Sequence, residues 1–374
     1  MIYFDNAATT LPLKEVIDDY AQKSLNSYAN PSSIHHLGVE NNAEINRIRN
    51  NILKKINLDS NKYEVIFTSG ATESNNLAIL GYCLKNKKRV HHILTSQIEH
   101  SSVLEVFRYL ETQGFKVDYI GVNSDGQIDY EELKKPIYSD VLFASFMTVN
   151  NEIGTVNDME KLKNALPKGC VFHSDCAQTF LKEKVDYNLF NMFTISEHKI
   201  YGLKGIGALI MKKGTNIEPI IYGGGQEYNL RSGTLDYPGI SSFNVAINMV
   251  SKNFDKYYKH ALTLRMYLIN KLKDNPEIII HDYKNNNPYI LNISLATKKA
   301  SVVVEALSNK EIYVSSVSAC NSKSEPISYV LLALGKSSNE AHNSIRISFG
   351  WYNTIEEIDI FFNTLNDILN NIRG

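Results

Sequence analysis

The stretch EVIFTSGATES, residues 64–74, contains the pattern that decides the fold. Its first five residues are rich in β-branched and aromatic side chains, which indicates a buried strand. Ser69, Gly70 and Ala71 then allow a tight turn, and a helical pattern follows from Thr72 to Leu84. The unpaired N–H groups at such a helix start can bind a phosphate. Taken alone, the signal is weak, because most such turns are N-caps without a ligand.

Strands and helices alternate on both sides of this stretch through the first two-thirds of the chain. This spacing predicts βα units and a mostly parallel sheet covered by helices on both faces. A glycine-rich loop at 222–225 and a long helix from about 238 to 272 come next. We expect an α/β large domain, residues 15–255, and a smaller α+β domain formed by residues 1–14 and 256–374. Further strands are expected at 92–95, 117–120, 141–147, 171–174, 192–196, 290–295, 312–316 and 344–348.

The bulk composition is that of an ordinary globular protein. The chain has 374 residues, 43 % of them apolar and 21 % charged, with 39 Lys plus Arg against 40 Asp plus Glu. A net charge of −1 favours neither nucleic acid nor an anionic membrane as a partner. No stretch approaches the roughly 20 apolar residues of a membrane helix. We therefore predict no direct nucleic-acid or membrane contact.

The cysteines indicate a reducing compartment. Cys83, Cys170, Cys176 and Cys320 are widely scattered and form no Cys-x-x-Cys pair. This spacing argues against a zinc site or a disulfide framework. The first residues also lack the basic and apolar regions of a signal peptide. We predict a cytoplasmic protein with reduced thiols and no metal.

Two candidate catalytic residues follow strand ends. Asp175 closes the strand at 171–174, and Lys199 comes just after the strand at 192–196. Open α/β sheets bind ligands at the carboxyl ends of their strands. A carboxylate there could keep a cofactor ring nitrogen protonated, and a lysine could form a Schiff base. The simpler alternatives are a helix-capping aspartate and a solvated surface lysine.

Two more candidates lie in the last third. Cys320 stands in SSVSACNS, residues 315–322, where the serine-rich surroundings favour an accessible thiol over a buried one. Arg346 alternates with apolar residues in a strand, so its guanidinium points to one face and suits a carboxylate. A surface salt bridge is an equally good explanation of Arg346.

The ordered set of motifs resembles the cysteine desulfurases of the class V aminotransferase group. The resemblance runs from residue 3 to about residue 357. It rests on YFDNAATT (3–10), NPSS (30–33), FTSGATESNN (67–76), EH (99–100), VNNEIG (149–154), HSDCAQ (173–178), HKIYG (198–202), RSGT (231–234) and the Cys320 segment.

This resemblance implies a fold type I transferase that depends on pyridoxal 5'-phosphate (PLP), with a seven-stranded sheet in its large domain. Lys199 matches the lysine that binds PLP and moves protons, and Asp175 matches the partner of the ring nitrogen. Gln178 matches the group at the phenolic oxygen, while His100 and Ala177 match the residues on the two ring faces. The resemblance places Ala71, Thr72, Ser196 and His198 at the phosphate, with Thr234 reaching it from a second subunit.

The resemblance also implies a reaction and partners. Arg346 and Asn150 match the groups that hold the carboxylate of L-cysteine, and Cys320 matches the nucleophile that takes its sulfur as a persulfide. His100 is a candidate acceptor for the substrate's thiol proton. The products would be L-alanine and sulfur for a scaffold or a tRNA-thiolation enzyme. Alternatives are selenocysteine lyase, cysteine sulfinate desulfinase, another class V activity, or a sulfur-relay protein without catalysis.

Some positions depart from the family pattern. Leu203 stands where Pro is common, Val317 where Gly is usual, Cys176 where Ala is usual, and Leu235-Asp236 where Glu-Asn is usual. The segment after Cys320 resembles the subgroup with a longer, mobile catalytic loop. The chain ends at Gly374 without the tail by which housekeeping members dock an iron–sulfur scaffold, so we expect a different sulfur acceptor.

Overall fold

A seven-stranded sheet forms the centre of the larger part of the molecule. The computed structural model describes residues 1–316 and 327–371, so Cys320 and Val317 lie outside the described residues. Every strand runs parallel to the others except β8. The strand order is β2 (Tyr63–Thr68), β8 (Gly207–Lys212), β7 (Met192–Ser196), β6 (Val171–Asp175), β5 (Phe143–Ser145), β3 (His92–Ser96) and β4 (Lys116–Ile120).

This confirms the predicted mostly parallel α/β sheet and corrects two details of it. The strand expected at 141–147 is only three residues long, because the chain leaves the sheet after Ser145. Strand β8 was not predicted at all, although its apolar run GALIMK is typical of a buried strand. It fills the space between β2 and β7 and runs antiparallel to both.

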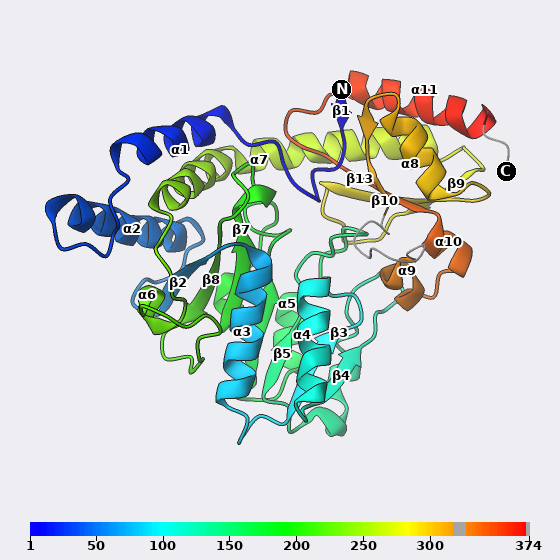
Figure 1. Cartoon of the computed structure of the whole chain (residues 1–374). Helices are drawn as coiled ribbons and strands as arrows, with labels where there is room; N and C mark the ends of the chain where they lie inside the picture. Colours follow the sequence, from blue (N-terminus) through cyan, green and yellow to red (C-terminus); the bar gives the residue numbers. More distant parts are fainter. Residues whose placement is uncertain (317–326, 372–374) are drawn as a thin grey trace.

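Helices cover both faces of this sheet (Figure 1). Alternate residues of a strand point to opposite faces. Ile66 accordingly packs in one apolar cluster with residues of α3 (Ala71–Lys85) and α4 (Ser101–Thr112). Val65 and Phe67 belong to the other cluster, with residues of α2 (His36–Lys55) and α7 (Tyr237–Leu272). The remaining elements here are α1 (Lys14–Asn26), α5 (Met159–Ala165), α6 (Gln226–Asn229), η1 (Glu132–Lys134), η2 (Pro136–Tyr138), η3 (Tyr187–Leu189) and η4 (Glu197–Lys199).

A second apolar core lies at the other end of the long helix α7 (Figure 1). Its four-stranded antiparallel sheet has the order β12 (Ser315–Ser316), β13 (Ser344–Ser348), β10 (Ile290–Leu295) and β9 (Ile278–His281). The predicted strand at 312–316 is in fact two strands, because β11 (Ile312–Tyr313) pairs with β1 (Ile2–Tyr3) instead. Helices α8 (Ala300–Ser308), α9 (Tyr329–Ala333), α10 (Ser338–His342) and α11 (Ile355–Asn371) complete this part.

Helix α7 belongs to both cores. Its residues up to Tyr257 pack with the large sheet, whereas those from Leu264 onward pack in the second core. The predicted boundary after residue 255 lies close to this change. The division into two domains stays a prediction.

The parallel strands bring their carboxyl ends to one edge of the large sheet, and the N-terminal segment crosses that edge. Thr10 donates its N–H to the carbonyl of His198 at 2.9 Å, and Leu13 donates to Tyr201 at 2.9 Å. On its other side, the N–H of Ser348 in β13 donates to the Phe4 carbonyl at 2.7 Å. Residues 4–13 therefore join the two sheets directly above the strand ends.

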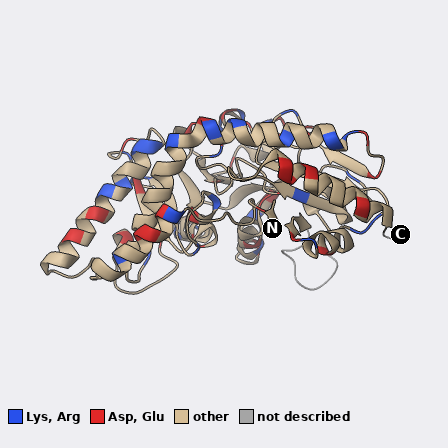
Figure 2. Ribbon diagram, turned by 90° about the horizontal axis from the view of Figure 1, so that it is seen from above, with Lys and Arg blue, Asp and Glu red and all other residues tan. Residues whose placement is uncertain are grey.

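Charges of both signs are interspersed over the molecule (Figure 2), in keeping with the net charge of −1. Within residues 1–316 and 327–371, no helix combines the length and apolar character needed to cross a bilayer.

Candidate active site

A cavity of about 610 Å³ opens at the carboxyl edge of the large sheet, next to the small sheet. Both sheets and the N-terminal segment contribute to its lining. The predicted site residues found there are Ala71, Thr72, His100, Asp175, Ala177, Gln178, His198, Lys199 and Arg346. A volume of this size suits a cofactor together with a small substrate.

Asp175 ends strand β6 and is held by two hydrogen bonds. Its Oδ2 accepts from Nδ2 of Asn75 at 2.8 Å, and its Oδ1 accepts from the N–H of Ala177 at 2.9 Å. Asn75 comes from α3, so the helix after the quoted stretch orients the carboxylate. Beneath Asp175, burial lowers the pKa of His173 to about 4. His173 is therefore neutral, and Asp175 supplies the negative charge at this strand end.

Lys199 lies in η4, directly after β7, and reaches the N-terminal segment. Its Nζ donates to the carbonyls of Ala7 at 2.6 Å and Ala8 at 2.8 Å. Nε2 of Gln178 donates to the same Ala7 carbonyl at 2.8 Å. The Gln178 Oε1 is buried and has no partner among the described residues. A ligand group in the cavity would supply the donor that this oxygen lacks.

His100 is the N-cap residue of α4. Its Nδ1 accepts from the backbone N–H of Ser102 at 3.1 Å and lies 2.8 Å from the Ser102 Oγ. Burial lowers the pKa of His100; the charge of Asp175 opposes this, and the charges of Lys199 and Arg346 add to it. The imidazole is therefore neutral near pH 7.

The turn at residues 69–72 forms one end of the cavity. Gly70 has a φ of +149°, which residues with a side chain rarely adopt. Ser196 points its Oγ toward this turn, and that buried oxygen has no partner in the described parts of the chain. His198 contacts the Thr9 Oγ1 through Nδ1 at 3.2 Å, and burial with nearby lysines lowers its pKa to about 4. This end combines helix N–H groups with an unpaired hydroxyl.

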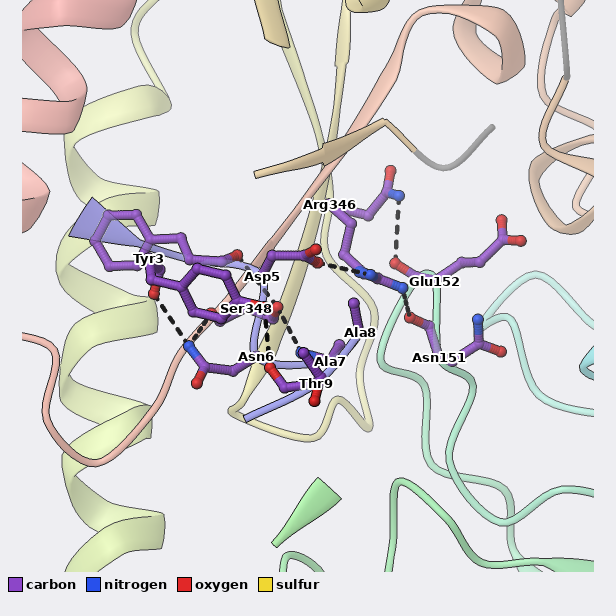
Figure 3. A network of polar contacts seen from close by, with 12 residues as sticks. Tyr3, Asp5, Asn6, Ala7, Ala8, Thr9, Asn151, Glu152, Arg346 and Ser348 are labelled. Atoms are coloured by element: carbon purple, nitrogen blue, oxygen red, sulfur yellow. Dashed lines mark hydrogen bonds and ion pairs between the residues drawn. The ribbon is translucent and has the colours of Figure 1, made fainter. Parts of the chain in front are cut away.

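Arg346 reaches the cavity from β13, as the alternation in its strand predicts. Figure 3 shows its guanidinium between Asp5 and Asn151. The Asp5 Oδ1 accepts from Nη2 at 2.8 Å, and the Asn151 carbonyl accepts from Nη1 at 3.0 Å. Its Nε has no partner within the described residues. A single further carboxylate can therefore still bind this guanidinium.

Asn150, predicted to hold the substrate carboxylate, lies outside the cavity lining. Its side chain is buried inside its own turn, where Nδ2 donates to the Ile98 carbonyl and Oδ1 accepts from the N–H groups of Glu152 and Ile153. It does not line the cavity, whereas its neighbours Asn151 and Glu152 do. Burial raises the pKa of Glu152 to about 7.

Three other predicted residues are not part of the described cavity lining, and one of them is Ser196, whose Oγ lies behind the turn at Gly70. Thr234 is exposed and lies outside the lining. Cys320 falls in the stretch that the structure does not describe. The described residues on both sides of that stretch do line the cavity, namely Ser315 and Ser316 before it, and Ile327 and Tyr329 after it.

Several groups that position the site were not predicted from the sequence. Asp5, Ala7 and Ala8 lie in the quoted motif YFDNAATT, yet the motif alone assigned them no task. Asn75 also lies in a quoted motif, and Ser102 follows EH directly. Nothing in the spacing indicates which of these residues contact the cavity.

The aminotransferase class-V family model matches residues 2–361. The cysteine desulfurase IscS of Dictyoglomus turgidum is 37 % identical over 377 residues, which cover 100 % of this chain and 95 % of the relative. The chain belongs to the cysteine desulfurase family. The mitochondrial cysteine desulfurase of Candida albicans is 39 % identical and matches 100 % of this chain and 77 % of its own length.

Solved structures agree with this membership. A NifS-like protein superimposes with a TM-score of 0.92 at 33 % identity, covering 99 % of this chain and 100 % of that one. The structure of SspA in complex with cysteine has a TM-score of 0.81 at 31 % identity and covers 95 % of this chain and 100 % of its own. The fold is the type I fold of PLP enzymes.

Members of this family depend on PLP, and the cavity fits that cofactor. It offers a buried carboxylate for the ring nitrogen, an unpaired Gln178 oxygen and a lysine amine. The helix start at Ala71 and the unpaired Ser196 hydroxyl suit a phosphate. The described residues contain no cluster of three His, Cys, Asp or Glu side chains that could hold a metal ion.

Proposed function

We propose that this protein converts L-cysteine to L-alanine and keeps the sulfur as a persulfide on Cys320. One observation carries the proposal. The cavity brings Lys199, Asp175 and His100 from the large sheet together with Arg346 from the small sheet, and the residues flanking the Cys320 stretch line the same space.

The residues of the large sheet would hold the cofactor. Asp175 would pair with the protonated ring nitrogen, and Gln178 with the phenolic oxygen. His100 and Ala177 would lie against the two ring faces. The phosphate would bind at Ala71, Thr72, Ser196 and His198. When bound, PLP supplies an electron sink for negative charge at the substrate's α-carbon.

The other residues would hold the substrate and move protons. Arg346 would bind the α-carboxylate through the donors that Asp5 and Asn151 leave free. Lys199 would take a proton from the substrate's α-carbon and return one later. The Cys320 thiol would receive the sulfur. L-cysteine and the enzyme thiol thus become L-alanine and an enzyme persulfide, with atoms and electrons balanced.

We also propose a homodimer in which Thr234 reaches the phosphate site of the partner. Thr234 is exposed in the single chain, and Arg231 beside it pairs with Glu73 of the cavity lining at 2.8 Å. Large apolar side chains are exposed on the α1 and α2 side of the molecule, including Leu25, Tyr28 and Ile34. A dimer would bury such a surface. Light scattering that gives the mass of one chain would contradict this.

The sulfur acceptor would be a scaffold for iron–sulfur clusters or a tRNA-thiolation enzyme, and the site of action the cytoplasm. These proposals rest on membership of the cysteine desulfurase family. Transfer of labelled sulfur from the persulfide to purified candidates of both kinds tests them. Transfer to neither would refute this part of the proposal.

Alanine formation from cysteine is the decisive test of the activity. The wild-type holoenzyme should form alanine, and Cys320→Ala should not. Selenocysteine and cysteine sulfinate can release their leaving groups without a protein thiol, so turnover of those substrates should survive in Cys320→Ala. Cysteine turnover that is equal in both proteins would favour one of the alternative PLP activities. Cys83→Ala is the matched control, because that thiol is fully buried.

A further inference from the structure

The hydrogen bonds at His100 determine which of its ring nitrogens carries a proton. A backbone N–H can only donate, and that of Ser102 points at Nδ1 at 3.1 Å. Nδ1 must therefore be the acceptor nitrogen. In a neutral imidazole the other nitrogen then carries the proton. His100 lines the cavity, and its Nε2 makes no hydrogen bond within the described residues.

The hydroxyl of Ser102 supports the same arrangement. Nδ2 of Asn75 donates to the Ser102 Oγ at 2.9 Å and to the Asp175 Oδ2 at 2.8 Å. Because a carboxylate can only accept, Asp175 determines which end of the Asn75 amide faces it. Asn75 therefore donates to Ser102, whose own proton is left to donate to Nδ1 of His100 at 2.8 Å. Asn75, Ser102 and Asp175 are all buried.

We propose that Ser102, oriented by Asn75 and Asp175, is a positioning residue that keeps the proton of His100 on Nε2. His100 then donates a hydrogen bond into the cavity and binds the substrate sulfur as a thiolate. This differs from the acceptor role expected from the sequence, because the only acceptor nitrogen of His100 is already occupied by two donors. That the bound group is the sulfur of cysteine rests on the proposed function. The position of the proton on Nε2 does not depend on that function.

Charges around His100 favour the neutral imidazole. Lys199 and Arg346 disfavour an imidazolium, and Asp175 opposes them. A proton added at Nδ1 would also face the Ser102 N–H. His100 would therefore stay neutral, and the substrate thiol would lose its proton to water before binding. The kcat/KM for cysteine should then rise toward the thiol pKa of about 8.5.

The position of the proton can be measured without turnover. Holoenzyme labelled with ¹⁵N-histidine should show a neutral Nε2–H signal for His100 at pH 8, identified by its loss in His100→Gln. In Ser102→Ala the backbone N–H still donates to Nδ1, but loss of the hydroxyl donor should shift part of the population to the Nδ1–H form, and Ser102→Thr should restore the wild-type signal. A wild-type His100 that carries its proton on Nδ1, or is an imidazolium, would overturn the proposal.

Kinetics test the consequence. Ser102→Ala should lower kcat/KM for cysteine about tenfold, because a misplaced proton removes a hydrogen bond to the charged substrate sulfur. Thr112→Ala is the control, because it removes an exposed hydroxyl at the far end of the same helix. A Ser102→Ala enzyme with the wild-type spectrum and pH profile would refute the role of Ser102.

A second pair of variants separates donor from acceptor. His100→Gln keeps N–H donors but removes the titrating base, whereas His100→Ala removes both. We expect His100→Gln to retain about tenfold more kcat/KM than His100→Ala. Equal rates would refute the donor role. If the wild type forms no alanine but shows the Nε2–H signal, the proposed function fails and the positioning of the proton stands.

Discussion

The two sides of the cavity are organised differently. On the large-sheet side, Asp175 and His100 are positioned by Asn75 and Ser102, which belong to helices of the same sheet. On the other side, Arg346 pairs with Asp5, which is 341 residues away in the sequence. Neighbouring βα units therefore preorganise one side. The other side takes shape only when the N-terminal segment and the second core have docked.

This difference predicts distinct consequences of mutation. Changes on the large-sheet side should alter chemistry with little effect on assembly. Changes on the Arg346 side should alter substrate binding and the docking of the N-terminal segment together. The following variants test this contrast, in order of decreasing effect.

Lys199→Ala should lower alanine formation at least about 10³-fold, because it removes the amine that binds the cofactor and moves protons. Absorption spectra and alanine assays measure the effect. Lys161→Ala is the control, since Lys161 is exposed and its contacts with Asp158 and the Tyr130 ring lie away from the cavity lining. The urea midpoint of Lys199→Ala should stay close to that of the wild type. A large loss of stability would show that the contacts of Lys199 with the Ala7 and Ala8 carbonyls hold the N-terminal segment in place.

Arg346→Lys should raise KM for cysteine about 100-fold and lower kcat less. A lysine keeps the charge but loses the planar fork, so it cannot contact Asp5, Asn151 and a substrate carboxylate together. Steady-state kinetics measure both constants. A fall in kcat with an unchanged KM would place Arg346 in the chemistry instead of in substrate binding.

Asp5→Asn should lower the free energy of unfolding by about 2 kcal/mol, because it removes the counter-charge of a mostly buried guanidinium. The pair is only 10 % and 19 % exposed. Lys14→Ala, which breaks an exposed pair with Asp18, should change stability by less than about 0.5 kcal/mol. Equal effects in urea unfolding would show that docking does not depend on Asp5.

The smallest expected change in stability concerns Glu197, which lies two residues before Lys199 in the sequence. Its Oε1 accepts from the Leu203 N–H at 2.9 Å, a donor that a Pro at that position would lack. Burial raises the pKa of Glu197 from 4.5 to about 8. The folded chain therefore binds more protons than the unfolded chain between those values, and stability falls as pH rises through this range.

Glu197→Gln should make stability less dependent on pH between 5 and 8. Burial also raises the pKa of Glu99 to about 8 and that of Glu152 to about 7, so a shallower slope should remain. Urea unfolding at several pH values measures it. An unchanged slope in Glu197→Gln would mean that this carboxyl is ionised in the folded chain.

Much of the fold and the cofactor side could be predicted from the sequence. Strands 192–196, 290–295 and 344–348 have their predicted bounds, because β-branched and aromatic residues alternate between clear turn signals. Asp175 and Lys199 were found because ligands bind at strand ends. Strand β8 was missed, although its apolar run was visible.

Other features depended on the folded geometry of the backbone. Asn150 and Asn151 are adjacent and chemically identical, yet only Asn151 lines the cavity. The backbone turn decides this, because Asn150 satisfies the N–H groups of that turn. The motif YFDNAATT likewise gave no sign that Asp5 would hold Arg346.

The sequence by itself determined the alternation of strands and helices, the strand-end positions of Asp175 and Lys199, and the family to which the chain belongs. These follow from local periodicity and from residue types at fixed spacing. Only the tertiary structure decided what the His100 Nδ1 contacts, which asparagine faces the cavity, and what holds Arg346. Each of these depends on how the backbone turns and which groups then come within hydrogen-bond distance, and such geometry exists only after the chain has packed.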